Sequence, residues 1–469
     1  MLEFSIAIPE SLENQLRTKL LANKENEDGV FAFWRPAKGK RRKTGLIVDW
    51  LAPHVNEVLH HGNITLTTEY YTRAREKALQ LKAGLVLVHT HPLGSGWQLP
   101  SSFDKKVEGV KIGPEIEDLT GQPMIGMILS GDGTWSARFY STNLKGKTTL
   151  NECVSVRIVG KYLKLHFNPS LKPQPDQLPQ QVRTRNVWGD ARQADISRLR
   201  IGVIGYGSVG SLVCEQLVRV GVTELIVMDF DRVEIHNLDR LLGSNLRDAK
   251  KHNKKLSIAK RNLPKAATSD HFRLILEEGS IVEPESFYSA LDADVLFSCV
   301  DRNWPRQVLN HIAYTCLIPV VDGGVSIFVR KNGEVQHAVV RAQTVGPERA
   351  CLSCLGMYDA GKIQLERDGI LIDPEYIRNL GTDERYKLEQ ESQNIMPFSV
   401  LLSGIEMGQF IELVTGIAST GDIGRQQYDY LTGEMSPDRE TCHPDCEYVR
   451  RIGDGSINLP VLGKDPAID

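Results

Sequence analysis

Short apolar runs and one helix-like stretch alternate along the first third of the chain. The runs FAFW (31–34), GLIVDWL (45–51) and GLVLV (84–88) have the length and composition of strands, and TTEYYTRAREKALQLK (67–82) is typical of a helix. We therefore predict a first domain in which several strands surround one helix.

A polar stretch rich in proline and glutamine, NPSLKPQPDQLPQQV (168–182), follows that pattern. Proline opposes both a helix and an interior strand, so we predict that residues 166–182 link a domain at 1–165 to a second domain at 183–469. Beyond the linker, apolar strands and helices alternate, as in LRIGVIG, SLVCEQLVRV, ELIVMD, DVLFSCVD, RQVLNHIAYTC and IPVVDGG. This alternation predicts a parallel, doubly wound α/β sheet.

The composition excludes several classes of protein. A chain of 469 residues with 41% hydrophobic and 25% charged residues is typical of a globular protein with two or three domains. The net charge of -3 provides no field to hold nucleic acid or an anionic membrane, and no run of about 18 apolar residues occurs. We therefore expect a cytoplasmic protein that binds neither. Its eight cysteines are too few for a disulfide scaffold.

Two histidines and an acid in the first domain form a candidate metal site. His89 and His91 lie two residues apart at the end of GLVLV, so their side chains point to the same side. Ser101 and Asp104 lie three residues apart at a predicted helix start. Two histidines plus one carboxylate make a catalytic zinc set, although the histidine pair alone is also typical of a hydrogen-bonded surface pair.

An acidic residue ahead of an early strand completes this set. Glu27 stands just before GVFAFW and is the predicted general base, with Glu25 as the alternative. Glutamate, His-Thr-His-Pro and Ser-x-x-Asp in this order resemble the JAB/MPN (JAMM) zinc metalloprotease family over residues 1–165. That family cleaves ubiquitin-like proteins from precursors or conjugates.

The resemblance implies an α+β, cytidine-deaminase-like fold for the first domain. It implies that the two histidines and Asp104 bind a catalytic zinc ion, that Glu27 takes a proton from water, and that Ser101 stabilises the oxyanion. The stretch LGSGWQLP (93–100), between the histidines and Ser101, is longer than in the family pattern.

A glycine fingerprint opens the second domain. Gly205, Gly207 and Gly210, in IGVIGYGSVG, lie between an apolar strand and a helix, where backbone amides can approach a phosphate. Asp229 ends the next strand and can accept hydrogen bonds from ribose hydroxyls. NAD, FAD and ATP proteins all share this signal.

The string DFDRVEIHNLDR (229–240) is more specific. It adds Asn237 and Arg240, which a triphosphate needs and a dinucleotide does not. With Lys255 in KLSIAK and Asp301 in FSCVDRNWPR, the string resembles the ThiF/MoeB and ubiquitin-activating-enzyme superfamily over residues 183–450. That superfamily is Rossmann-like and adenylates the C-terminal glycine of a ubiquitin-like protein with ATP and Mg2+.

The resemblance implies a role for each motif residue. Asp229 holds the ribose and Asp231 lies in the same nucleotide site; the phosphates are bound by three residues, Asn237, Arg240 and Lys255. Asp301 binds magnesium. Arg185, in VRTRNVWGDARQ, is similar to the arginine that superfamily members insert into a partner subunit's site, which implies a homodimer. Ser208 replaces a glycine of the family pattern.

Four cysteines near the C-terminus form two close pairs, Cys351 with Cys354 and Cys442 with Cys446. Four thiolates make a closed, structural zinc site, and the superfamily carries one. The second pair has one more intervening residue than the first, so His443 is an alternative ligand. The remaining cysteines lie in apolar patterns that predict packing: Cys153, Cys214, Cys299 and Cys316.

The segment from Leu355 to Ile395 contains no cysteine. Activating enzymes that pass their cargo to a conjugating enzyme usually capture it on a cysteine of this crossover segment. Two alternatives follow. Either adenylation is the only activation step, or a hydroxyl group accepts the acyl group as an oxyester. The segment offers Ser392, which is our candidate, and Thr382. A polar loop residue is the simpler interpretation of Ser392.

Together these motifs predict a zinc peptidase fused to an adenylating enzyme, both acting on a ubiquitin-like protein with a C-terminal glycine. We favour a bacterial-type conjugation system, with a conjugating-enzyme-like protein as a further partner, over sulfur-carrier activation in cofactor biosynthesis. Two other classes stay open. One is an NAD-dependent oxidoreductase with a metal domain, and the other is a non-catalytic scaffold that binds the carrier.

Overall fold

The computed structural model describes residues 2–23, 25–60, 64–143, 146–381, 393–419, 422–455 and 461–468. The chain packs as two compact units. The N-terminal unit comprises Met1–Gln174, Thr315–Leu317 and Arg451–Ile457, and the C-terminal unit comprises Pro175–Tyr314, Ile318–Arg450 and Asn458–Asp469. Residues 168–178, in the proline- and glutamine-rich stretch, form no helix or strand.

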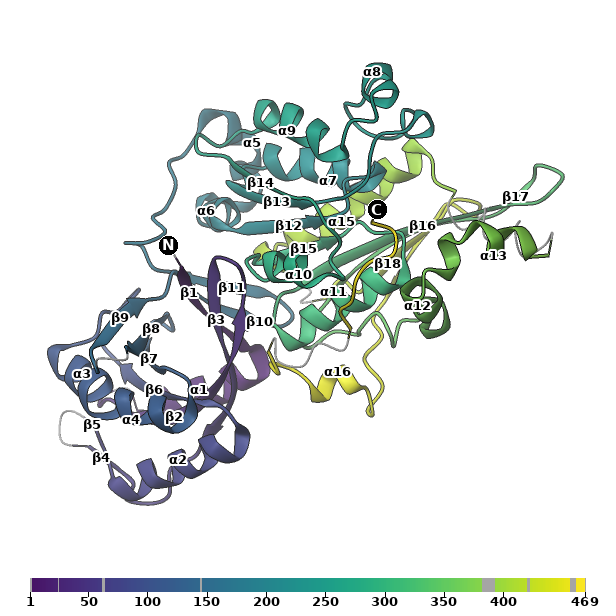
Figure 1. Ribbon diagram of the computed structural model, residues 1–469. Coiled ribbons are helices and arrows are strands. Elements are labelled where there is room, and N and C mark those ends of the chain that lie inside the picture. Colours follow the sequence, from purple (N-terminus) through teal and green to yellow (C-terminus); the bar gives the residue numbers. More distant parts are fainter. Residues whose placement is uncertain are drawn as a thin grey trace. The chain divides into compact units, whose positions relative to one another are not determined.

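A mixed sheet forms the centre of the N-terminal unit (Figure 1). In the described part of the chain its strand order is β11 (Leu163–Phe167), β10 (Ser155–Val159), β1 (Glu3–Pro9), β3 (Arg42–Leu51), β2 (Gly29–Lys38), β6 (Gly84–His91), β7 (Met124–Ser130), β8 (Trp135–Thr142) and β9 (Thr148–Glu152). The three strands predicted from apolar runs, β2, β3 and β6, lie side by side in the middle. A separate hairpin pairs β4 (Val58–His60) with β5 (Ile64–Leu66).

Helices cover both faces of this sheet because its central strands are apolar on both sides. The helices are α1 (Glu10–Leu20), α2 (Thr68–Leu81), α3 (Ser102–Lys106), the π-helix η1 (Val107–Ile112) and α4 (Gly113–Thr120). On β2, Val30 and Trp34 pack in one core with Leu16 of α1, whereas Phe31 packs with Tyr70 of α2 in the other. This alternation follows the two-residue period of a strand.

The C-terminal unit contains a second sheet, which is only partly parallel. Its order is β14 (Arg273–Glu277), β13 (Glu224–Met228), β12 (Arg200–Ile204), β15 (Val295–Ser298), β16 (Val320–Val329), β17 (Val335–Val345), β18 (Arg425–Asp429) and β19 (Glu434–Asp438). The first five strands in this order, from β14 through β13, β12 and β15 to β16, are parallel to one another, as predicted. The last three strands, β17, β18 and β19, extend the sheet in antiparallel pairing. The strands predicted from the sequence, β12, β13, β15 and β16, all belong to the parallel part. The antiparallel extension, which the sequence pattern did not predict, begins where β16 and β17 form a long hairpin.

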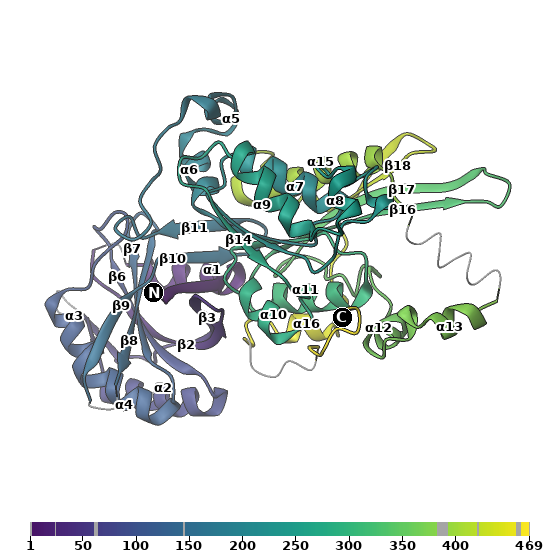
Figure 2. The same ribbon diagram turned by 45° about the horizontal axis from the view of Figure 1, so that its top comes forward.

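Helices on both faces make this sheet doubly wound. Figures 1 and 2 show α7 (Ser208–Arg219) and α9 (Lys255–Ala266) on one face, and α10 (Pro284–Ala290) and α11 (Asn303–Thr315) on the other. The other helices of this unit in the described ranges are η2 (Pro179–Gln181), α5 (Val182–Trp188), α6 (Asp190–Arg198), η3 (Ile235–Asn237), α8 (Leu246–Lys250), α12 (Ala360–Arg367), η4 (Ile370–Ile372), α13 (Pro374–Asn379), α15 (Met396–Thr415) and α16 (Glu447–Arg450).

Helix α15 lies against α7, β16 and β17. Its length and mean hydropathy of 1.3 would suffice to cross a membrane, but 56% of the apolar window is buried inside the unit. Leu402 and Phe410 belong to the core, and Glu406 and Glu412 are buried beside them. Helix α15 therefore serves as a core helix of the C-terminal unit.

Candidate functional site

A candidate metal site lies where strand β6 ends and helix α3 begins. The rings of His89 and His91 have centroids 5.2 Å apart, and Nε2 of His89 lies 3.8 Å from Oδ2 of Asp104. One ligand atom of each residue lies within 4.8 Å of the other two. Nε2 of His89 is buried and has no hydrogen-bond partner among the described residues. These donors fit the ligand set of a zinc ion.

Strand pairing brings Glu27 to this site. Gly29 of β2 is paired with His89 of β6 in antiparallel register, so Glu27, two residues before Gly29, falls opposite His91. Its Oε1 atom lies 3.9 Å from Nε2 of His91. Glu25, the alternative base, is exposed and has no contact with the histidines among those the structure describes.

The protonation states of these groups suit a metal site. Burial lowers the pKa of His89, and the Arg138 guanidinium adds to the effect, so the ring is neutral, as a metal ligand must be. Burial raises the pKa of Glu27, and the charge of His91 opposes this increase. A carboxylate with a raised pKa is better able to accept a proton near neutral pH.

Ser101 holds the Asp104 carboxylate at the start of α3. Its Oγ accepts a hydrogen bond from N of Asp104 at 3.1 Å, and its own N donates to Oδ2 of Asp104 at 2.7 Å. Behind this capping box, the guanidinium of Arg138 on β8 donates to Glu108 from Nε at 2.8 Å. That buried pair ties η1, the helical turn after α3, to the sheet.

The glycine loop of the C-terminal unit joins β12 to α7. Gly205 has a φ of 97°, and a Cβ there would lie 2.4 Å from O of Cys299. A Cβ on Gly210 would lie 1.9 Å from O of Gly205, whereas a Cβ on Gly207 would meet nothing within 4 Å. Gly205 and Gly210 are thus required by close backbone packing, and Gly207 leaves open space before the N-terminus of α7.

The acids after β13 lie beside this loop. The carboxylate of Asp229 accepts hydrogen bonds from N of Tyr206 at 2.7 Å and from N of Asp231 at 2.8 Å. Burial raises the pKa of Asp229 to about 6, although the charge of Lys255 opposes the increase. Nζ of Lys255 lies 2.6 Å from Oδ2 of Asp231. The loop, an acid pair and a cation therefore meet at one edge of the sheet.

A cavity of about 1410 Å³ brings the remaining motif residues to the same place. Asn237, Arg240 and Asp301 line it, together with Gly205, Gly207, Asp229, Asp231 and Lys255. The guanidinium of Arg240 donates to O of His236 at 2.7 Å, which holds it at the rim of the cavity. Gly210 does not line the cavity and serves the packing of the loop.

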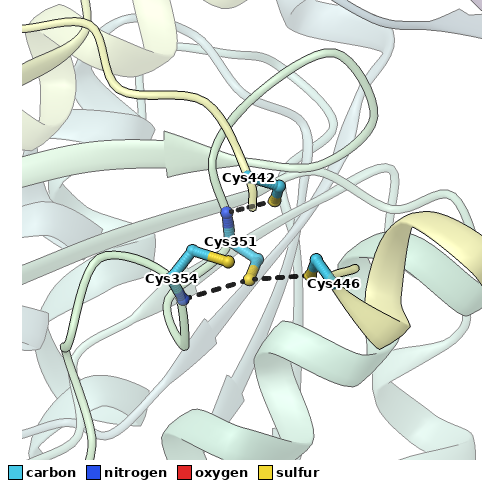
Figure 3. Close-up of side chains that lie close together, drawn as sticks. All are labelled: Cys351, Cys354, Cys442 and Cys446. Carbon is cyan, nitrogen blue, oxygen red and sulfur yellow. Dashed lines mark hydrogen bonds between the residues drawn. The ribbon is translucent and has the colours of Figure 1, made fainter. Parts of the chain in front are cut away.

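The four C-terminal cysteines meet at a single point (Figure 3). One pair of sulfur atoms, Sγ of Cys351 and Sγ of Cys446, lies 3.6 Å apart, and all four sulfur atoms lie within 4.8 Å of one another. Sulfur atoms bound tetrahedrally to zinc lie about 3.8 Å apart. Nδ1 of His443 accepts a hydrogen bond from N of Asp445 instead. The geometry thus fits four cysteines rather than His443 as ligands.

A family model described as the ThiF family matches residues 179–448, which is more than half of the 469 residues. The chain belongs to the ThiF family. The glycine loop, the acids after β13, Lys255, Asp301 and the cysteine tetrad all lie within the matched region.

Several curated proteins similar to this ThiF-family chain are named ubiquitin-like modifier-activating enzyme 5. That of Dictyostelium discoideum is 26% identical over 178 residues, 34% of this chain and 42% of that protein. That of Gallus gallus is 24% identical over 300 residues, 56% of this chain and 69% of that protein. The chain therefore spans less than half the length of the first relative. A crystal structure of E. coli MccB with ATP covers 58% of this chain and 74% of its own, with 15% identity and a TM-score of 0.44.

Charged residues that no sequence motif singles out also line this cavity, among them Arg306, Arg341 and Glu406. Behind the lining, Asp322 of β16 accepts hydrogen bonds from Nε of Arg306 and Nη1 of Arg341, both at 3.2 Å. Beside it, Glu406 is fully buried, and neither carboxylate oxygen has a hydrogen-bond partner in the described ranges. Burial raises its pKa well above the ordinary value, and Asp322 adds to the increase. The sequence did carry a signal for Glu406: it is a charged residue inside the long apolar segment 396–415, and an acid in such a segment is seldom buried without a specific role.

Other predicted residues lie away from the cavity. The guanidinium of Arg185 donates to Asp190 at 2.7 Å and to Gln177 at 2.7 Å, and Arg185 does not line the cavity. Ser392 and Thr382, the candidate acyl acceptors, fall outside the described residues. Cys299 does line the cavity, and burial raises its pKa well above the ordinary value, so it is a thiol rather than a thiolate.

Proposed function

We propose that the C-terminal unit uses ATP to adenylate the C-terminal glycine of a ubiquitin-like protein. The observation that carries this proposal is a single cavity lined by the open glycine loop at Gly207 and by the cations Arg240 and Lys255. Its volume of about 1410 Å³ exceeds that of most small-molecule sites, which is about 300–1,000 Å³. A nucleotide and the end of a peptide can therefore be held together.

The side chains suit an in-line displacement. A carboxylate oxygen of the glycine bonds to the α-phosphorus of ATP, the bond from that phosphorus to its bridging oxygen breaks, and pyrophosphate leaves with the electron pair. Asn237 can donate to the phosphates, and Arg240 and Lys255 offset the charge that develops on the leaving group. Asp229 is positioned by two backbone amides to accept from the ribose. Asp301 would hold Mg2+, which neutralises phosphate charge.

The other classes explain the cavity less well. An NAD-dependent oxidoreductase would use the glycine loop and Asp229 but would give Arg240, Lys255 and Asp301 no role. A scaffold that only binds the carrier would not need a phosphate loop. Membership of the ThiF family and similarity to ubiquitin-like modifier-activating enzymes support the adenylating function.

We further propose that the N-terminal unit is a JAMM-type zinc peptidase acting on the same carrier. His89, His91 and Asp104 would hold the zinc ion, which supplies a Lewis acid for the scissile carbonyl and for water. Glu27 lies beside His91 and can accept and return a proton at Oε1. Ser101, whose Oγ accepts from N of Asp104 at the start of α3, would donate its hydroxyl proton to the oxyanion.

A shared carrier explains why the two activities would be joined. The peptidase would expose the terminal glycine or remove the carrier from its targets, and the adenylating site would activate that glycine. We favour reversible tagging with a conjugating-enzyme-like partner over sulfur transfer, because a fused peptidase suits a reversible modification. The cysteine tetrad would hold a structural zinc ion that fixes the loop after β17 to the C-terminal segment.

One surface of the C-terminal unit has the features of an interface with a second copy of the chain. Helix α15 exposes Val400, Gly404 and Gly408, and Gly408 borders an apolar groove of about 540 Å³. Trp188 of α5 also lines that groove, and Arg185 lies one turn earlier on the same short helix. A second copy bound on this face would have Arg185 at its interface.

ATP–pyrophosphate exchange tests the adenylating function. With ATP, Mg2+ and a candidate carrier ending in glycine, the purified chain should exchange labelled pyrophosphate into ATP. A carrier that lacks only the terminal glycine should give no exchange. Exchange that does not depend on any carrier, or no exchange with each carrier offered from its own genomic neighbourhood, would contradict the proposal.

Cleavage of a carrier fusion tests the peptidase. Glu27→Ala should abolish cleavage while the zinc content stays unchanged, because Glu27 handles a proton and is not a ligand. Glu25→Ala is the matched control, since Glu25 lies on the same loop but is exposed, and it should cleave normally. Retained cleavage by Glu27→Ala would assign the base elsewhere.

A further inference from the structure

We infer that Gln98 is a positioning residue of the N-terminal metal site, which fixes the ring tautomer of His91. The inference rests on the proposed zinc peptidase. Nδ1 of His91 lies 3.3 Å from Oε1 of Gln98. An amide oxygen only accepts hydrogen bonds, so Nδ1 must carry the proton. The lone pair is then on Nε2, the ring atom that faces Glu27 at 3.9 Å.

The orientation of the Gln98 amide follows from its other contacts. Its Nε2 group donates to O of Ser95 at 2.8 Å and to O of Gly96 at 3.3 Å. A flipped amide would turn its oxygen toward these two carbonyl oxygens and lose both hydrogen bonds. The local backbone therefore directs Oε1 toward His91.

The loop that carries Gln98 is itself fixed to the turn between β7 and β8. The carboxylate of Asp132 accepts hydrogen bonds from Oγ of Ser95 at 2.9 Å and from N of Gly96 at 2.7 Å. Oγ of Ser130 donates to O of Gly96 at 2.8 Å. Partial burial opposes ionisation of Asp132, but the hydrogen bonds from Gly96 and Thr134 outweigh it and lower its pKa to about 2.

The same loop also fixes the backbone of His91. Its carbonyl oxygen accepts from N of Gly94 at 2.9 Å and from N of Gly131 at 3.0 Å. Both the backbone and the ring of His91 are therefore held by residues 94–98 and by the β7–β8 turn. The additional length of this stretch relative to the JAB/MPN pattern has a structural role, because it brings an acceptor to Nδ1.

This arrangement has a quantitative consequence for metal binding. A histidine whose second nitrogen is hydrogen-bonded holds its metal in one tautomer and one ring orientation, and loss of such a partner typically costs about 10–100-fold in metal affinity. Gln98→Ala should weaken zinc binding by that amount. Gln98→Glu keeps an acceptor oxygen but loses both donations to Ser95 and Gly96, so its zinc affinity should fall between those of Gln98→Ala and the wild type.

Chelator competition on the full chain measures the effect. The zinc ion of interest is the one that His89→Ala removes, which distinguishes it from any zinc at the cysteines. Gln80→Ala, on the exposed face of α2, is the matched control and should bind like the wild type. In the metal-free protein, ring nitrogen shifts of labelled histidines should report the Nδ1–H tautomer of His91, and Gln98→Ala should give a mixture.

The outcomes separate the inference from the proposed function. Unchanged affinity and an unchanged tautomer in Gln98→Ala, in a protein whose wild type binds zinc and cleaves, overturn the inference alone. A wild type that binds no zinc at this site overturns both.

Discussion

Nζ of Lys255 lies 2.6 Å from Oδ2 of Asp231, within the cavity that also contains Asp229. Burial alone would lower the pKa of Lys255, but the charges of Asp229 and Asp231 outweigh this effect and raise it. The ammonium group is therefore charged and held in place before any phosphate arrives. This makes Lys255 the clearest single test of the phosphate site.

Lys255→Ala should lower the rate of pyrophosphate exchange by about 100- to 1,000-fold, because it removes one preorganised cation from the leaving group. Lys254→Ala is the matched control, since its Nζ pairs with Glu278 at the surface, with Lys254 and Glu278 side chains 42% and 51% exposed. That variant should exchange at nearly the wild-type rate. Equal losses of exchange rate in both variants would show that the substitutions act by disturbing the start of helix α9, and not by removing the charge of Lys255.

Two glycines of the loop should respond differently to alanine. Gly210→Ala places a Cβ against O of Gly205 and should destabilise the fold by about 1–3 kcal/mol, seen as a lower melting temperature. Gly207→Ala meets no neighbour within 4 Å, so it should fold normally but occupy space next to the phosphates. Nucleotide titration should then show weaker ATP binding by Gly207→Ala. Normal ATP affinity in that variant would place the phosphates elsewhere.

The sequence predicted these glycines, the acids after β13 and the cysteine pairs because each is fixed by local chain geometry or by short spacing. It did not predict Arg306, Arg341 and Glu406 as cavity residues, or Asp322 as the partner of the two arginines, since their meeting depends on how β16, β17 and α15 pack. The antiparallel strands β17 to β19 were missed for a similar reason. Their pairing is set by a hairpin between residues 329 and 335 and by contacts distant in sequence.

Glu406 should make stability depend on pH. Because its pKa is raised in the folded chain, folded Glu406 keeps a proton that the unfolded chain releases above its ordinary pKa. Its contribution to stability is therefore present at low pH and is lost as pH rises from about 5, by at most about 1.4 kcal/mol per pH unit. Glu406→Gln removes this dependence.

Melting curves at pH 5, 6, 7 and 8 check the Glu406 prediction, using the transition that ATP shifts upward. The melting temperature of Glu406→Gln relative to wild type should increase steadily with pH. Glu434→Gln, on the exposed strand β19, should show no such trend. A constant difference at all four pH values would mean that Glu406 is ionised in the folded protein.

A mixture of two inactive variants tests the proposed homodimer. If Arg185 acts in the site of a second copy, Arg185→Ala and Lys255→Ala chains should each be inactive. Their mixed dimers would contain one intact site, so random mixing restores about one quarter of the wild-type exchange activity. No recovery in dimers whose mixing is verified by mass would assign Arg185 to its own chain.

The most direct test of the central claim is the intact mass of a candidate carrier after incubation with this protein, ATP and Mg2+. The proposed chemistry predicts a product heavier by one adenylyl group, located at the terminal glycine, with one pyrophosphate released per adduct. It also predicts that Lys255→Ala forms little of it. A carrier of unchanged mass, with no pyrophosphate released under conditions where ATP and carrier both bind, would contradict the assignment of this cavity to adenylation.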